Sequence, residues 1–152
     1  MPAFSGYRAD HTPSTTADNY TLDATGTGKT ARVRWISWGG RGTTSTGYQT
    51  RWVRPTTAGV TPTAGAMEAQ NPLYATPSCT LATIWGTQPV LPASPDALHL
   101  QDWNVHGGVG MIVLPLGAEW IVTTGILTAE LSCRNGAGTD AALSSYGICW
   151  EE

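Results

Sequence analysis

Hydrophobic and polar residues alternate along much of this chain with a period of two, which is typical of β-strands. The closing segment, residues 119–152, shows the pattern most clearly. Four residues share one face of an expected strand: Leu127, Ala129, Leu131 and Cys133. Three large residues share one face of the last expected strand: Tyr146, Ile148 and Trp150. We expect a turn over 135–140 between these strands, and we expect the last three side chains to fill the core of a two-sheet sandwich.

The same pattern upstream predicts further short strands, separated by loops rich in Gly, Pro and Thr. The expected strands cover 20–24, 31–38, 46–54, 66–70, 79–87, 98–105, 111–116 and 119–123. No segment has the helical period. The sequence therefore predicts an all-β protein, an antiparallel β-sandwich of about eight to ten short strands. The segment 111–116 is apolar on both faces, so we expect it between two layers or against a neighbouring subunit.

The N-terminal segment, residues 1–18, is rich in Pro, Ser and Thr and shows no periodicity. We expect an extended arm over 1–18 and one folded domain over 19–152. Such an arm is either a loose terminus or a segment laid on a neighbouring chain. Phe4 and Tyr7 are its aromatic anchors.

The composition supports a β protein, because charged residues make up only 12% of the chain and there are 18 glycines. Seven Trp stand against one Phe. A core of this size does not hold seven central indoles, so we expect some at an inter-subunit seam or stacked on sugar faces, although core and edge packing explains any single one well.

Charge is unevenly distributed along the chain, although the net charge is only −3. Residues 24–67 contain no acid and six basic residues: Lys29, Arg32, Arg34, Arg41, Arg51 and Arg54. The remainder holds all eleven acids against Arg8 and Arg134. The negative net charge argues against a nucleic-acid partner bound by bulk electrostatics. The basic segment is either neutralised within the chain or forms a patch that meets an acidic surface elsewhere.

The segments 31–38 and 46–54 look like two strands of one hairpin, whose pairing would gather the arginines. In the first strand, alternation places Val33 and Trp35 on one face and Arg34 with Ile36 on the other. The hairpin and the arm together provide the candidate interface residues: Arg32, Arg34, Arg41, Arg51, Arg54, Trp38, Phe4 and Tyr7.

The sequence shows no pattern of a targeting signal and no cysteine spacing typical of a disulfide framework. The three cysteines are an odd number without metal-ligand spacing, so free thiols and synthesis in a reducing host cytoplasm are expected. No apolar run approaches the length of a membrane span, and we expect no membrane partner.

Two motifs resemble a nucleotide-binding loop and a metal site, but in each case the residue pattern does not fit that function. Residues 25–30 end in the Gly-Lys-Thr of a phosphate loop, but Asp23 replaces the required first glycine and a strand follows in place of a helix. His99, Asp102 and His106 can ligate metals, yet on a strand His99 and Asp102 point to opposite faces. We therefore expect neither a nucleotide nor a metal or other cofactor.

Catalytic patterns are equally weak. The sequence contains no G-x-S-x-G elbow, and nothing marks a cysteine as activated. A pair drawn from four carboxylates would suit a small hydrolase, which we keep as a third hypothesis. These four residues are Asp96, Asp102, Glu119 and Glu130. We expect a protein that is not an enzyme.

The closing segment from Gly117 to Glu152 resembles the ends of small jelly-roll proteins from tailed-phage virions. The matching parts are Trp120-Ile121-Val122, Leu127 to Cys133 and Ile148-Cys149-Trp150-Glu151. The ARVRWISWGG and RWVRPTTAG segments resemble phage structural proteins as well. The resemblance covers the last third of the chain well and the middle loosely. It implies an antiparallel jelly roll, often trimeric, that decorates or cements a capsid or forms a spike or fibre base.

We therefore expect a non-enzymatic virion structural protein, a decoration or cement subunit that binds and stabilises a phage capsid as a homotrimer. Its expected partners are other copies of itself and the major capsid protein or neighbouring virion proteins. It would be made in the host cytoplasm and located in the virion. The alternative is a carbohydrate-binding or adhesion module, or a spike or fibre base, in which exposed Trp and Tyr stack on a glycan.

Overall fold

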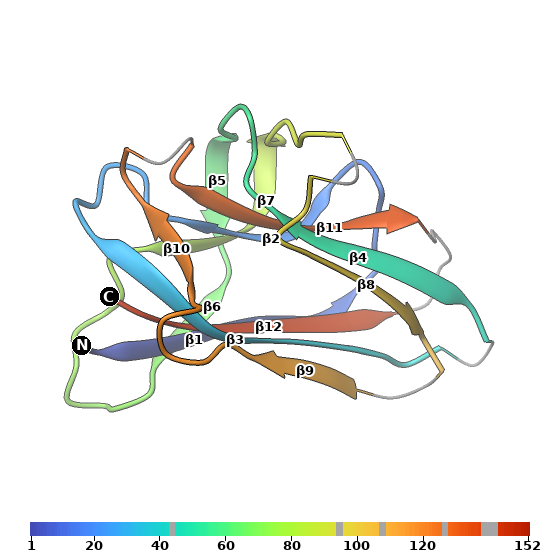
Figure 1. The fold of residues 1–152 in the computed structure, drawn as a ribbon, viewed down its shortest axis with the longest axis horizontal. Coiled ribbons are helices and arrows are strands. Elements are labelled where there is room, and N and C mark those ends of the chain that lie inside the picture. The colour runs from blue at the N-terminus through green and yellow to red at the C-terminus, as the bar shows by residue number, and fades with distance from the viewer. Residues whose placement is uncertain (43–44, 94–95, 107–108, 126–127, 138–142) are drawn as a thin grey trace.

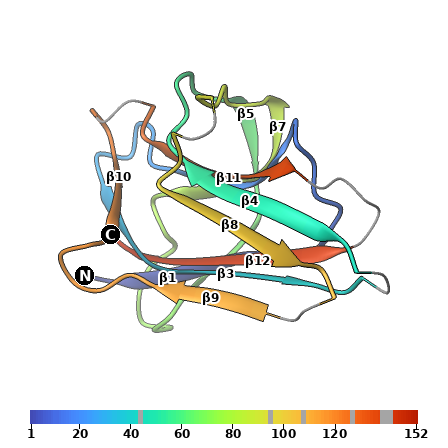
Figure 2. The same ribbon diagram turned by 45° about the vertical axis from the view of Figure 1, so that its right-hand side comes forward.

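The structure is a computed structural model of the chain, and it describes residues 1–42, 45–93, 96–106, 109–125, 128–137 and 143–152. These residues form twelve β-strands and contain no helix. The strands pair antiparallel in two sheets that stack as a sandwich (Figure 1 and Figure 2). The predicted all-β antiparallel sandwich is confirmed, with more strands than the eight to ten expected.

Sheet A has the order β10-β3-β12-β1-β6, and β9 also pairs with β3. Its strands are β1 (Ala3–His11), β3 (Thr30–Gly40), β6 (Ala66–Ala69), β9 (Val109–Val113), β10 (Trp120–Thr123) and β12 (Ser144–Glu151). Sheet B has the order β5-β7-β2-β11-β4-β8. Its strands are β2 (Asp18–Asp23), β4 (Gly47–Val53), β5 (Val60–Ala64), β7 (Thr80–Thr87), β8 (His99–Asn104) and β11 (Glu130–Ala137).

The two ends of the chain pair with each other strand by strand. β1 pairs with β12, β2 with β11, β3 with β9 and β4 with β8. The chain thus resembles one long double-stranded ribbon folded over, so that successive pairs fall in alternate sheets. β5, β6 and β7 add strands at one side of the sandwich, with β6 at the edge of sheet A and β5 at the edge of sheet B.

The core lies between the two sheets and is rich in aromatic residues. Tyr146, Ile148 and Trp150 are fully or almost fully buried in it, as predicted for the last strand. Burying one such side chain contributes roughly 1.5–3 kcal/mol. Ala129, Leu131 and Cys133 are buried as well, whereas the predicted partner on their face, Leu127, lies outside the described residues.

The turn predicted over 135–140 is wrong for its first three residues, because β11 continues to Ala137. The Asn135 side chain is buried, and its Oδ1 accepts hydrogen bonds from Asn19 Nδ2 at 3.0 Å and Thr50 Oγ1 at 3.1 Å. These bonds satisfy a turn-forming residue inside the sandwich. Residues 138–140 of the predicted turn lie outside the described residues.

The N-terminal segment differs from the loose or neighbour-bound arm that we expected. Residues 3–11 form β1, which lies between β12 and β6 in sheet A. The segment is extended, and its partners are strands of its own chain. The predicted loop at 55–65 likewise contains a strand, β5. Neither strand shows a clean apolar period, because short edge strands and strands rich in small residues carry little of that signal.

The predicted hairpin of residues 31–38 and 46–54 is wrong. Both segments are strands, but β3 belongs to sheet A and β4 to sheet B. One edge of β3 is occupied by β12, and the other by β9 and β10. The chain after Gly40 therefore crosses from one layer to the other. Local alternation predicts a strand but does not specify which distant strand pairs with it.

A register shift in β3 changes which face its side chains occupy. Trp35 lies opposite Cys149 and Val33 lies opposite Trp150, so Arg34 is an extra residue without a counterpart in β12. Such a β-bulge breaks the alternation at one point. Val33 and Ile36 consequently both face the core, and the prediction that Val33 and Trp35 share a face is wrong.

Candidate functional site

The face of sheet A that points away from sheet B is open, and its middle carries apolar and small polar side chains without charge, while Glu68, Arg32 and Glu151 lie toward its margins. Its outward residues come from β1, β12, β3 and β9: Ser5, Tyr7, Ser145, Gly147, Trp35, Ser37, Val109, Met111 and Val113. An ordinary sandwich places polar side chains on such a face. We therefore take this face as the candidate functional site.

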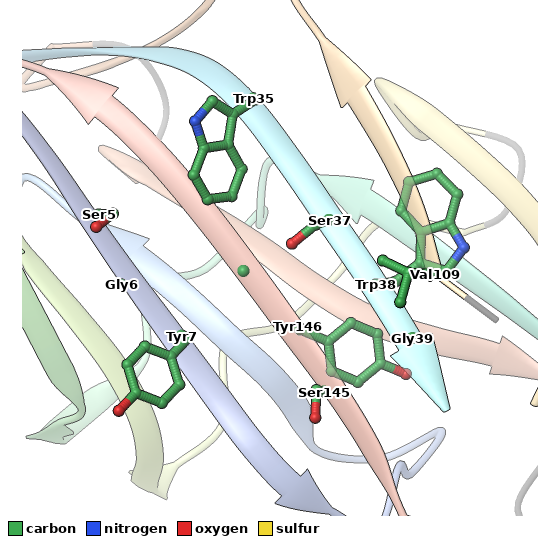
Figure 3. A pocket seen from close by; sticks show the side chains of 11 residues that line it. Ser5, Gly6, Tyr7, Trp35, Ser37, Trp38, Gly39, Val109, Ser145 and Tyr146 are labelled. Carbon is green, nitrogen blue, oxygen red and sulfur yellow. The ribbon is translucent and has the colours of Figure 1, made fainter. Parts of the chain in front are cut away.

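A groove runs over β12 in the middle of this face (Figure 3). Tyr7 of β1 borders it on one side and Trp35 of β3 on the other, with Ser37 and Ser145 further along β3 and β12. Its volume is about 230 Å³, and none of its lining residues is charged. The floor includes backbone of Gly6 and Gly147, and the missing side chain of Gly147 keeps the surface low.

β9 carries a second exposed feature beside the groove. Val109, Met111 and Val113 are 84%, 60% and 61% exposed, and we call them the β9 strip. The inward residues of this segment are Ile112, which is half-buried, and Leu114, which is buried. The predicted apolar strand is therefore an edge strand with one face open and not a strand between two layers. Of the two environments predicted for it, contact with a neighbouring subunit is the one that this position permits.

The β9 edge lacks the protection that the other sheet edges have. Edge strands of soluble proteins are usually blunted by charges, by proline or by a covering group. β6 carries Glu68, β5 carries Pro62 and β8 carries Asp102. At β10, the guanidinium of Arg54 donates to the Ile121 carbonyl oxygen at 3.2 Å. β9, with the sequence Val-Gly-Met-Ile-Val, has no charge and no proline, and it pairs with β3 alone.

The arginines predicted for an interface are dispersed, and several are paired within the chain. Arg34 Nη1 lies 2.6 Å from Glu119 Oε1, and Arg34 Nε lies 3.6 Å from Glu151 Oε1. Arg41 is exposed and forms an ion pair with Asp10. Intramolecular neutralisation thus accounts for part of the split charge. All three ion pairs lie outside the set of residues that lines the groove.

Of the remaining three arginines, two donate to backbone carbonyl oxygens and one lies beside the ion pairs of Arg34. Arg51 donates to the Pro92 carbonyl oxygen at 3.3 Å on sheet B, and Arg54 holds Ile121 as described above. Arg32 is half-buried and lies opposite Glu151 and Ile121 in the sheet. The structure therefore does not bring the predicted arginines into one patch.

The aromatic candidates are divided between core and surface. Phe4 is buried beside Trp150, with 6.0 Å between ring centroids, and Trp38 is buried beside Trp52 at 5.5 Å. Trp38 also lies beneath the groove. Tyr7 is 58% exposed and forms one side of the groove, so among the predicted residues it is the one whose ring faces solvent there.

The outer face of sheet B is built in the opposite way, because it is polar and covered. Arg134 Nε contacts Asp18 Oδ1 at 2.5 Å, and Arg134 Nη2 donates to the Pro89 carbonyl oxygen at 2.9 Å. Thr21 donates to Asp18 Oδ2 at 2.6 Å and accepts from the Trp85 indole at 3.1 Å. The loops before β5 and after β7 lie over this face (Figure 1). Asp18, Thr21, Trp85 and Arg134 therefore find their partners within the chain, whereas Arg51 Nε is buried without one among the described residues.

The carboxylates considered for hydrolysis are on separate elements. Glu119 pairs with Arg34, and Asp102 accepts from Gln49 Nε2 at 3.0 Å on β8. Glu130 is buried at the start of β11 and accepts from the Gly59 backbone N–H at 3.1 Å. Burial, reinforced by the charge of Asp23, raises the pKa of Glu130 to about 8. Asp96 lies in the segment between β7 and β8.

The other predictions about chemistry are resolved by the strands. His99 faces inward and Asp102 outward on β8, as predicted. β3 follows the Gly-Lys-Thr turn, so the segment has no helix N-terminus for a phosphate. Within the described ranges, no group of three His, Cys, Asp or Glu is placed to hold a metal, and no helix is long and apolar enough to cross a membrane.

The three cysteines are free and buried. Cys133 belongs to β11 in sheet B and Cys149 to β12 in sheet A, so they do not lie on neighbouring strands. Burial raises the pKa of the Cys79 thiol to about 12, which disfavours the reactive thiolate.

Trp35, Gly147 and the β9 strip are the functional candidates that sequence reasoning missed. The bulge at Arg34 brings Trp35 to the outer face, and the local alternation of residues does not predict a bulge. The apolar run at 111–116 was the one available signal for β9. It indicated burial or a subunit contact without deciding between them.

Comparisons with protein-family models, with curated proteins and with solved structures gave no match for this chain.

Proposed function

We propose that this chain is a non-enzymatic structural subunit of a phage virion, a decoration or cement protein that associates through the free β9 edge of sheet A. The self-associated form is a homotrimer, and its second partner is the major capsid protein. The residues that resemble phage virion proteins support the setting. The observation that carries the proposal is the β9 edge, which is apolar, exposed and unprotected.

The pairing of the strands supports a jelly roll as the fold. In a jelly roll, an antiparallel ribbon rolls into two facing sheets with two Greek keys. The pairs β1·β12, β2·β11, β3·β9 and β4·β8 follow that scheme, with neighbouring pairs in alternate sheets. β5, β6, β7 and β10 are then additions at the edges.

The physical argument for association rests on what an exposed apolar edge costs. A free edge offers unpaired N–H and C=O groups to another strand, and the β9 strip adds apolar area beside them. Pairing with a second chain would satisfy the backbone groups and remove the strip from water. A capsid subunit needs such a surface, because it must remain folded alone and then bind its neighbours.

The first experiment measures the oligomeric state of the purified chain by size-exclusion chromatography with light scattering. We expect a trimer, and we expect Val113→Lys to give a monomer because it places a charge at the contact. Ile84→Lys is the matched control, since Ile84 is 57% exposed on β7 of sheet B, compared with 61% for Val113. A wild-type monomer at high concentration would overturn the proposed association.

The second experiment addresses the virion. An antibody against the chain should label purified phage particles, and shells assembled without the chain should bind added wild-type protein more tightly than the Val113→Lys variant. Particles without label, together with shells that ignore the protein, would exclude the capsid role even if the trimer forms.

A further inference from the structure

We infer that the groove over β12 is a binding site for a neutral saccharide, with Trp35 and Tyr7 as its aromatic walls. This inference goes beyond the proposed structural role. It rests mainly on β1, β12 and β3, whereas association rests on the free edge of β9, and Val109 is the residue that belongs to both surfaces.

Small residues on three neighbouring strands create the groove. Tyr7 lies opposite Gly147 in β12, and Gly147 lies opposite Ser37 in β3. A Cβ on Gly147 would lie 2.6 Å from Ser37 Oγ and 3.3 Å from Cζ3 of Trp35. The absent side chain thus leaves room beneath the edge of the indole. Any larger residue at 147 would raise the floor and displace Trp35.

The polar groups of the groove are suited to a ligand with many hydroxyls. Ser5 Oγ accepts from Gln70 Nε2 at 2.6 Å and keeps acceptor and donor capacity. Among the described residues, no hydrogen-bond partner engages the hydroxyls of Tyr7, Ser37 and Ser145 or the indole N–H of Trp35. These groups are open to solvent beside apolar ring faces (Figure 3). A sugar ring has the same combination, with C–H groups on one face and hydroxyls around the edge.

The electrostatics select a neutral ligand. The groove lining contains no charged residue. The charged groups nearest in the fold are Arg34, which pairs with Glu119 and Glu151, Arg41, which pairs with Asp10, and the exposed carboxylate of Glu68, which lies opposite Ser5 on β6. A phosphate, sulfate or carboxylate in the groove would lose its hydration without gaining a free cation. The lining therefore favours an uncharged glycan over a sialylated or sulfated one.

The size of the groove limits what it holds. Its volume of about 230 Å³ is below the roughly 300–1,000 Å³ of pockets for drug-sized ligands. One ring of a glycan fits between Tyr7 and Trp35, with the rest of the chain continuing over the open face. Few contacts of this kind give weak single-site binding, and a trimer would strengthen it through multivalency.

The test uses the full chain and a panel of neutral sugars: glucose, galactose, N-acetylglucosamine and their short oligomers. Sialylated and sulfated oligosaccharides serve as charged comparators. Binding is followed by titration calorimetry and by tryptophan fluorescence. We expect at least one neutral sugar to bind and to change the fluorescence, and we expect Trp35→Ala to weaken that binding tenfold or more. Trp120→Phe, a change at a half-buried Trp of β10 outside the groove, should leave it unchanged.

Gly147→Ala provides an independent variant, because it raises the floor of the groove without removing either aromatic side chain. We expect it to weaken binding as well. Circular dichroism verifies that each variant is folded, and Trp35→Phe replaces Trp35→Ala if the latter is not. The inference is overturned if no neutral sugar binds at millimolar concentration, if only charged sugars bind, or if the Trp35 variants bind as wild type.

Two further readings separate this inference from the proposed function. The monomeric Val113→Lys variant should still bind the sugar in its single groove. This binding is expected whether or not a virion carries the protein. Conversely, if a second copy of the chain occupies the groove, Trp35→Ala will abolish the trimer and saturating sugar will have no site. That result would overturn the saccharide site and leave association intact.

Discussion

The two outer faces of the sandwich are built in opposite ways. On sheet B, polar and charged side chains such as Asp18 and Arg134 are buried, because loops of the same chain cover them and supply hydrogen-bond partners. On sheet A, apolar side chains such as Met111 and Val113 are exposed, and no segment among the described residues covers them. One face is completed within the chain, whereas the other has the composition of a face that another molecule completes.

This difference shows that burial and polarity must be considered together. A polar face is stable under a cover only if most of its groups are paired, as Asp18, Thr21 and Arg134 are on sheet B. An exposed apolar face does not prevent folding, and covering it removes apolar area from water, which favours the binding of another molecule. Four measurements test the contrast, beginning with the largest expected effect.

The buried ion pair of sheet B should be the most sensitive feature of the two faces. Replacing Arg134 by Met leaves the Asp18 carboxylate buried without its cation, and we expect a loss of about 3–5 kcal/mol in the free energy of unfolding. Urea denaturation measures this loss. Arg41→Met, which breaks the exposed pair with Asp10, is the control and should cost less than about 1 kcal/mol. Equal losses would show that the cover of sheet B does not exclude water.

The cover itself should be tightly packed. A Cβ on Gly59 would lie 2.5 Å from a ring carbon of Trp85, so Gly59→Ala should destabilise the fold by about 1–3 kcal/mol. Gly47→Ala is the matched control, because nothing lies within 4 Å of a Cβ there. That variant should be neutral or stabilised by about 0.4–1 kcal/mol. If both variants behave alike in thermal denaturation, the loop before β5 is not seated on Trp85.

The buried carboxyl under this cover should make stability depend on pH. The pKa of Glu130 is about 8 in the folded chain, above its ordinary value of 4.5, so the folded state binds the proton more tightly. Its contribution is therefore favourable below about pH 4.5 and is lost as pH rises toward 8.

Glu130→Gln keeps a neutral acceptor for the Gly59 N–H and removes the titration. We expect the variant to gain stability relative to wild type between pH 5 and pH 8.5, by more than about 1 kcal/mol, since each pKa unit corresponds to about 1.4 kcal/mol. The exposed Glu68→Gln serves as the control. A wild-type stability that rises across this range in step with Glu130→Gln would contradict the assignment.

The exposed strip of sheet A should contribute least to folding. Val113→Thr should change the free energy of unfolding of the monomer by no more than about 0.5 kcal/mol, since the side chain is already in water. Val33→Thr on the neighbouring strand β3 is the comparison. There the hydroxyl is placed in the core and should cost about 1–3 kcal/mol. A large loss for Val113→Thr would mean that the strip is part of the folded core and not a free surface.

The contrast between the faces also explains which sequence predictions held. Tyr146, Ile148 and Trp150 were placed in the core correctly. Their large side chains alternate with small ones over the whole strand, so the face that is buried can be read from the sequence. The predicted arginine hairpin failed, since pairing of β3 with β12 joins residues more than a hundred positions apart. Local pattern contains no information on that choice. Trp35 was assigned to the wrong face for a related reason, because a single bulge at Arg34 reverses the phase of everything beyond it.

The sequence by itself determined the all-β class, most of the strands and the residues of the central core, because these follow from the period of two and from turn residues. It also indicated the unusual character of the segment 111–116. The tertiary structure decided the partners of each strand, the burial of β1 within sheet A and the opposite character of the two outer faces. These features depend on which distant segments meet and on which loops fold over which sheet, and both are settled by packing of the whole chain.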